Sequence, residues 1–111
     1  MASGNPATAA QAHSWNPLSL DPLLTEAALE QSLGHDGKAL ALYRQATTTQ
    51  PENPEGWVEL GLFELDGRRN PCAAYSALSR AWHLDRYDPA VAFHGGPLDQ
   101  ARARARKLGC A

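Results

Sequence analysis

The stretch Gln50–Leu65, QPENPEGWVELGLFEL, decides how we expect this chain to fold. It opens with a turn between Pro51 and Pro54, and the second proline follows Asn53. An asparagine side chain caps the first turn of a helix, and proline fits the first helical position because no hydrogen bond is lost there. The stretch therefore predicts a turn that joins two helices, with the second helix beginning at Pro54.

One face of this expected helix carries Trp57, Leu60 and Gly61, at positions i, i+3 and i+4. Glycine inside a helix costs about 1 kcal/mol relative to alanine. We therefore predict that Gly61 lies where a neighbouring helix comes close. The same register predicts that Trp57 and Leu60 pack against Ala74 and Leu78.

Similar cap and proline signals recur along the chain and predict six helices. Asp21 before Pro22, Asp36, and Asn70 before Pro71 are expected caps, and Gly34 is expected to end the helix that begins after Asp21. The expected helices cover residues 6–14, 22–33, 36–48, 54–66, 71–85 and 97–108. Because no segment reads convincingly as a strand, we predict an all-α fold, an antiparallel array of helical hairpins.

An internal repeat of about 34 residues accompanies these helices. Pro17 and Pro51 are 34 residues apart, and Gly34 and Gly67, which each end a helical pattern, are 33 apart. The segments ALALYRQATTTQP and AAYSALSRAWHLDR read as the same element twice. We therefore expect the helices to pair as successive copies of one hairpin.

This pattern resembles the tetratricopeptide repeat (TPR) family over about residues 20–86. The residues that carry the resemblance are Leu23, Ala27, Gly34, Ala39, Tyr43, Ala46 and Pro51 in one copy and Trp57, Leu60, Gly61, Ala74, Leu78 and Ala81 in the next. The resemblance implies an α-α superhelix. It divides the chain into a helix of a truncated repeat (1–19), two repeats (20–53 and 54–88), and a loop with a capping helix (89–111). The segment DGRRNP departs from the pattern by one extra residue.

A second resemblance covers Trp15–Leu65, which is similar to the soluble tails of some bacterial O-antigen ligase-like membrane proteins. It implies that the chain is a soluble domain of a membrane polysaccharide ligase or polymerase-like enzyme, with a regulatory or partner-docking role. This is the alternative to a free-standing interaction module, and flanking membrane spans would distinguish the two.

Composition narrows the class of protein. The net charge of −2 and the pI of about 6.0 argue against a general nucleic-acid surface. No apolar run approaches the roughly 18 to 20 residues that span a bilayer, so we expect no direct membrane insertion. Cys72 and Cys110 make no metal-binding motif, and we expect free thiols in a reducing compartment. These features predict a cytoplasmic location, either free or as the cytoplasmic tail of a membrane protein.

Candidate catalytic groups are few. Glu30 and Glu64 occupy equivalent places in the two copies, but we expect each to pair with a neighbouring arginine or to cap a polar helix contact rather than to perform acid–base chemistry. The run from His94 to Pro97, HGGP, is similar to oxyanion-hole loops, although it is more simply a turn. The histidines show no metal-binding spacing. We therefore expect no enzyme activity, no catalytic residue, no cofactor and no metal.

The first helix of each TPR copy lines the inner face of the superhelix. Matching the copies residue by residue places on this face Leu24, Ala28, Gln31, Val58, Glu59, Leu62 and Leu65. The resemblance thus implies an apolar strip with an acidic rim, which lacks the basic groups that clamp a carboxylate in some members. We expect a peptide or helix of another protein to bind there.

Charge is unevenly distributed along the chain. Residues 21–67 contain nine acids and two bases, whereas residues 68–111 contain eight bases and three acids. Two alternatives follow: copies of the chain associate weakly head to tail, or the basic C-terminal helix folds back on the acidic hairpins of its own chain.

The basic C-terminal helix itself is open to two interpretations. Its basic residues are Arg102, Arg104, Arg106 and Lys107, and its apolar stripe is Leu98, Ala101, Ala105 and Leu108. A basic face could bind anionic lipid or nucleic acid. We favour a capping helix, because the stripe is mostly alanine and carries no aromatic residue.

Overall fold

The computed structural model describes residues 19–87, 91 and 95–111. Within this part of the chain the structure is all-α, as predicted, and contains no strand. Its elements are α2 (Asp21–Ser32), α3 (Asp36–Thr49), α4 (Pro54–Leu62), the π-helix η1 (Phe63–Gly67), α5 (Pro71–Leu84) and α7 (Pro97–Lys107). Five of the six expected helices correspond to these elements. The helix expected at 6–14 lies outside the described residues.

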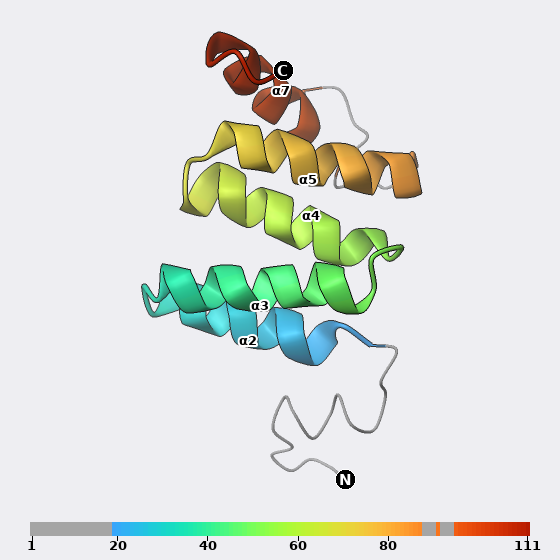
Figure 1. Cartoon of the computed structure of the whole chain (residues 1–111). Coiled ribbons are helices and arrows are strands. Elements are labelled where there is room, and N and C mark those ends of the chain that lie inside the picture. The colour runs from blue at the N-terminus through green and yellow to red at the C-terminus, as the bar shows by residue number, and fades with distance from the viewer. Residues whose placement is uncertain (1–18, 88–90, 92–94) are drawn as a thin grey trace, which may run out of the picture.

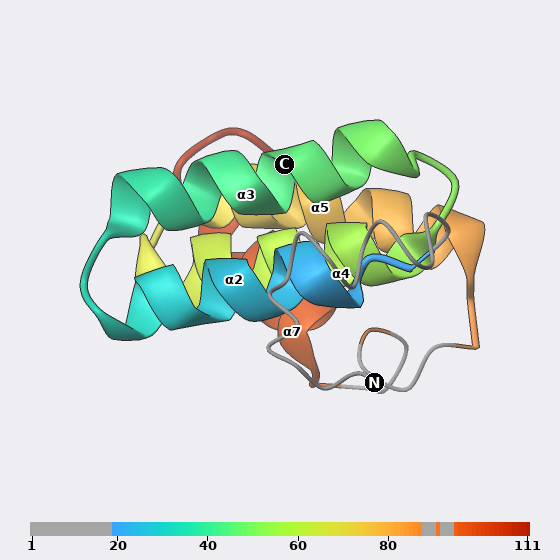
Figure 2. The ribbon, with the colours of Figure 1, turned by 90° about the horizontal axis from the view of Figure 1, so that it is seen from below.

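The helices form an elongated stack that follows the order of the chain from α2 to α7 (Figure 1). Viewed along the stack, α2 and α4 lie on one side, and α3 and α5 lie on the other (Figure 2). The hairpins α2–α3 and α4–α5 are therefore arranged as successive copies in two layers. No helix in the described ranges combines the length and apolarity needed to cross a membrane.

Asparagine caps open α4 and α5, as predicted. The Asn53 carboxamide oxygen accepts a hydrogen bond from the Glu55 amide at 2.9 Å, and that of Asn70 accepts from the Ala73 amide at 3.2 Å. The predicted aspartate caps are wrong, because Asp21 and Asp36 are already the first residues of their helices. A carboxylate in the first turn still favours the helix through its dipole.

The helices α4 and α5 come close together where Gly61 meets Leu78. A β-carbon built on Gly61 would lie 2.5 Å from Cγ of Leu78, which confirms the predicted close approach. Trp57 is half-buried between two parts of the core, and its indole N–H donates to the Pro51 carbonyl at 2.8 Å. Leu60 is buried in the part of the core that contains Tyr43, whereas Ala74 and Leu78 belong to the other part. The predicted packing of Leu60 against Ala74 and Leu78 is therefore not observed.

The turn of the second hairpin contains the segment DGRRNP, which is one residue longer than the repeat pattern requires. The chain accommodates the extra residue by forming the π-helix η1 at the end of α4. The Arg68 amide donates to the Phe63 carbonyl five residues earlier, at 2.9 Å. Helical structure ends at Gly67, but the left-handed residue of this turn is Arg69, with φ of +53°. In the first hairpin that role falls to Gly34, with φ of +80°. An arginine thus occupies a conformation that glycine adopts at much lower cost.

Cys72 and Cys110 form a disulfide, so the expected free thiols are wrong. The bond joins the first turn of α5 to the residues just after α7, with a Cα–Cα distance of 5.8 Å. Because 38 residues separate the two cysteines, their pairing depends on how α7 packs on α5.

The C-terminal helix α7 caps the stack on the α5 side (Figure 1). Three residues of its apolar stripe, Leu98, Ala101 and Ala105, are buried. Leu108 is 65% exposed, contrary to the expected stripe, because the helix ends at Lys107 and the chain turns away. The helix α7 packs on α5 of the second hairpin, at the opposite end of the stack from α2, so it lies against its own chain at that hairpin and not along the first.

Candidate binding sites

The residues predicted for the inner face lie on α2, α4 and η1, in one layer of the stack (Figure 2). Three of them, Leu24, Val58 and Leu65, belong to the hydrophobic core. The other four reach the surface: Ala28 is exposed, and Gln31, Glu59 and Leu62 are half-buried. The continuous apolar strip expected there is therefore absent, because part of it holds the helices together. The accessible face is smaller and of mixed polarity.

Gln31 on this face is held by Tyr43 of α3. The Tyr43 hydroxyl donates to the Gln31 carboxamide oxygen at 2.9 Å. Burial raises the pKa of Tyr43 above its ordinary value of 10.0, and the nearby negative charge of Glu59 raises this pKa further. The phenol therefore stays neutral and keeps the Gln31 amide in place.

Glu30 and Glu64, which occupy equivalent places in the two hairpins, both bind residues of the turn that follows their helix. A Glu64 carboxylate oxygen accepts from Arg68 at 2.9 Å, which confirms the expected arginine pairing for Glu64. A Glu30 carboxylate oxygen lies 2.6 Å from Nδ1 of His35, so Glu30 makes a polar contact at the end of its helix instead of pairing with an arginine. The backbone carbonyl of each glutamate also accepts from an amide beyond its helix, at 2.8 Å for Glu30 and 2.7 Å for Glu64.

The HGGP segment begins α7, and its described residues form a turn, as predicted. Gly95 has φ of +78°, and its amide donates to the Asp99 carboxylate at 2.8 Å. Pro97 is the first residue of the helix, and His94 lies outside the described residues. No group of three metal-ligating side chains occurs in the described ranges.

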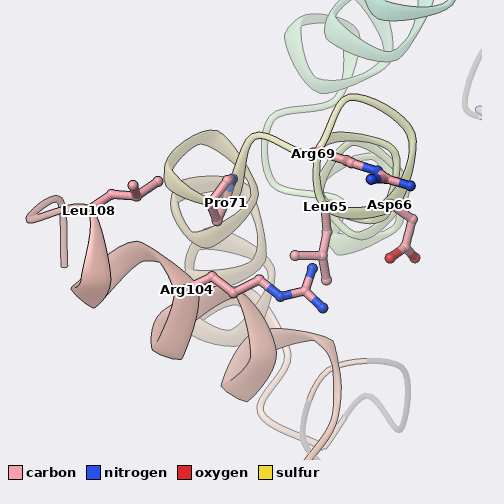
Figure 3. Close-up of a pocket in the computed structure, with 6 residues that line it drawn as sticks. All are labelled: Leu65, Asp66, Arg69, Pro71, Arg104 and Leu108. Atoms are coloured by element: carbon pink, nitrogen blue, oxygen red, sulfur yellow. The ribbon is translucent and has the colours of Figure 1, made fainter.

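A pocket of about 560 Å³ lies between α7 and the loop that joins η1 to α5 (Figure 3). The residues that line it are Leu65, Asp66, Arg69, Pro71, Arg104 and Leu108. Leu108 and Pro71 form one end, whereas Asp66 and Arg69 lie at the other (Figure 3). The guanidinium group of Arg104 points toward Leu65 and this charged end. The pocket thus has an apolar end and a charged end.

The two arginines of the pocket differ from their neighbours in the sequence. Arg68 pairs with Glu64, and Arg102 lies 3.6 Å from the Asp99 carboxylate. Within the described part of the chain, by contrast, neither Arg69 nor Arg104 has an ion pair or a side-chain hydrogen bond.

The sequence places Arg104 on a basic helix face but does not reveal Arg69 as a site residue or the pocket itself. The available signal was an arginine in a loop that is one residue longer than the repeat pattern requires.

No protein-family model matches the chain, and neither does any curated protein or solved structure.

Proposed function

We propose that this chain is a non-catalytic protein-interaction module of TPR type. What supports the proposal is the repetition of one hairpin. The α4–α5 pair follows the α2–α3 pair, and the first helices of both pairs lie in one layer (Figure 2). In both turns the backbone carbonyl of a glutamate, Glu30 or Glu64, accepts a hydrogen bond from an amide beyond its helix. Stacked hairpins of this kind form extended surfaces that bind other chains.

The partner surface that we propose is the accessible part of the α2–α4 layer. It is centred on Ala28 and Leu62, with Glu55 and Glu59 along its edge. A surface of mixed polarity that combines small apolar side chains with carboxylates fits a short amphipathic segment that carries lysine or arginine. The occupant is therefore a basic peptide or helix of another protein.

The disulfide points to an oxidising compartment in place of the predicted cytoplasmic location. Disulfides form and persist outside the reducing cytosol. Because Cys72 and Cys110 are joined, we propose that the domain works where this bond is stable.

Selection of peptides by the oxidised protein tests the interaction proposal. Peptides displayed on phage would be enriched on the full chain and then measured against two variants. Ala28→Arg places a cation on the proposed surface, and Ala41→Arg makes the same change at an exposed position of α3, in the other layer. We expect the selected peptides to be basic, to lose at least tenfold in affinity for Ala28→Arg, and to bind Ala41→Arg like the parent. Failure to enrich any peptide, or an equal response of the two variants, would overturn the proposal.

A further inference from the structure

We propose that the pocket between α7 and the η1–α5 loop binds a small amphipathic monocarboxylate, that is, a carboxylate attached to a short aliphatic chain. In this proposal Arg69 and Arg104 bind the carboxylate at the charged end of the pocket, beside Asp66, and the aliphatic chain lies toward Pro71 and Leu108 at the other end (Figure 3). This site is separate from the proposed peptide surface.

The charged end of the pocket selects the charge of the ligand. Arg69 and Arg104 come from different elements, and neither has a carboxylate partner within the described part of the chain. Guanidinium groups bind carboxylates through strong charge-assisted hydrogen bonds. Asp66 lowers the net charge of the lining to a single positive charge. A carboxylate balances that charge, whereas a phosphate monoester carries about −1.5 to −2 and would repel Asp66.

The backbone of Arg69 supports a ligand role for its side chain. Its left-handed conformation is the one that Gly34 adopts in the first hairpin, where glycine meets no steric penalty. Non-glycine residues in such conformations cluster at ligand-binding sites, where the surrounding structure holds them in place. The η1 turn thus places a strained arginine at the edge of a pocket, although a glycine would close the turn more easily.

The other end of the pocket suits an aliphatic chain. Leu65 is buried, whereas Leu108 is 65% exposed and faces the pocket beside Pro71 (Figure 3). Pro71 and Leu108 form the apolar wall of the pocket. Cys72 follows Pro71 and Cys110 comes shortly after Leu108 in the sequence, so the Cys72–Cys110 disulfide holds the two sides of this wall together covalently. A preformed wall reduces the entropy lost on binding. The volume of about 560 Å³ lies within the range of small-molecule sites.

Titration of the oxidised full chain with hexanoate, followed by amide NMR spectra, tests this proposal. We expect saturable shifts confined to the lining residues and their neighbours. Hexanamide has the same chain without the charge, and hexyl phosphate has a higher charge. We expect hexanoate to bind at least tenfold more tightly than either compound. If hexanamide bound as tightly as hexanoate, the proposed role of the charged end would be overturned. If hexyl phosphate bound more tightly than hexanoate, the assignment to a monocarboxylate would be overturned.

Variants identify the residues responsible. Arg69→Gly removes the guanidinium and relieves the backbone, so it keeps the fold, and Arg104→Gln removes the second cation. We expect each variant to weaken hexanoate binding at least tenfold. Arg106→Gln is the matched control, because Arg106 is an exposed arginine of α7 outside the pocket, and we expect its affinity to equal that of the parent. Unchanged binding by Arg69→Gly or Arg104→Gln, or an equal loss in Arg106→Gln, would show that hexanoate responds to general charge and would overturn the site.

Discussion

Gly61 of α4 and Leu78 of α5 are in such close contact that no side chain fits between them. A β-carbon on Gly61 would lie 2.5 Å from Cγ and 2.6 Å from Cδ2 of Leu78. Because both Leu78 and its surroundings are buried, the side chain has little room to move away. This contact sets the distance between the two helices of the second hairpin.

We therefore expect Gly61→Ala to lower the free energy of unfolding by about 1 to 3 kcal/mol, through overpacking. Gly37→Ala is the control, since a β-carbon on Gly37 meets nothing within 4 Å and α3 gains helix propensity. It should leave stability unchanged or raise it by up to about 1 kcal/mol. Urea denaturation measures both, and equal effects of the two variants would contradict the close contact.

Reduction of the Cys72–Cys110 disulfide is expected to destabilise the domain. For a sequence separation of 38 residues, the chain-entropy relation predicts a loss of about 4 kcal/mol. Denaturation with and without a reducing agent measures this loss. A Cys72→Ser/Cys110→Ser variant should show the lower stability in both conditions. Two free thiols per native, air-oxidised chain, measured by thiol titration, would contradict the bond.

Arg69→Gly is expected to raise stability by about 1 kcal/mol, because glycine relieves the left-handed backbone at this position. Arg68→Gly, one residue earlier, should lower stability instead. It removes the hydrogen-bonded partner of the buried Glu64 carboxylate, which then lacks its counter-charge. Thermal melts of the two variants should therefore shift in opposite directions, and a shared direction would argue against this turn geometry.

The pH dependence of stability is expected to involve Tyr43. Its pKa in the folded chain is raised by burial and by Glu59, so above pH 10 the unfolded chain loses this proton before the folded chain does. The stabilisation is complete below the ordinary pKa of 10.0 and is lost as pH rises through the folded-state pKa.

At pH 7, Tyr43→Phe should lower the free energy of unfolding by about 1 kcal/mol, because it removes the hydrogen bond to Gln31. The difference in stability between the parent and this variant should narrow above pH 10, since phenylalanine does not titrate. Urea denaturation of the parent and the variant between pH 7 and pH 11 measures this difference in the free energy of unfolding. A difference that stays constant with pH would exclude a raised pKa.

Weak self-association is expected from the charge distribution. The acidic α2–α3 hairpin and the basic helix α7 lie at opposite ends of the stack (Figure 1), so a head-to-tail contact brings opposite charges together. Exposed charges are screened beyond about 10 Å at 0.1 M salt. Sedimentation should therefore show larger species at low salt than at high salt, and a monomer under both conditions would exclude this contact.

Local signals explain why so much of the helix pattern could be predicted from the sequence. The caps at Asn53 and Asn70 and the stop at Gly34 act within one helical turn, so their effect does not depend on distant residues. The close approach at Gly61 was also predictable, because glycine weakens the interior of a helix and is favoured there where a neighbouring helix leaves no room for a side chain. These signals determine which residues are helical and where each helix turns.

Tertiary packing decided the features that bear on function. Leu24, Val58 and Leu65 became core residues rather than a binding strip, because burial depends on which helices meet. The pairing of Cys72 with Cys110 needed α7 to lie along α5. The pocket likewise joins residues from η1, α5 and α7 that are far apart in the sequence. The sequence by itself therefore determined the helices, through interactions within single turns, whereas burial, the disulfide and the pocket arise from contacts that form only when the hairpins stack.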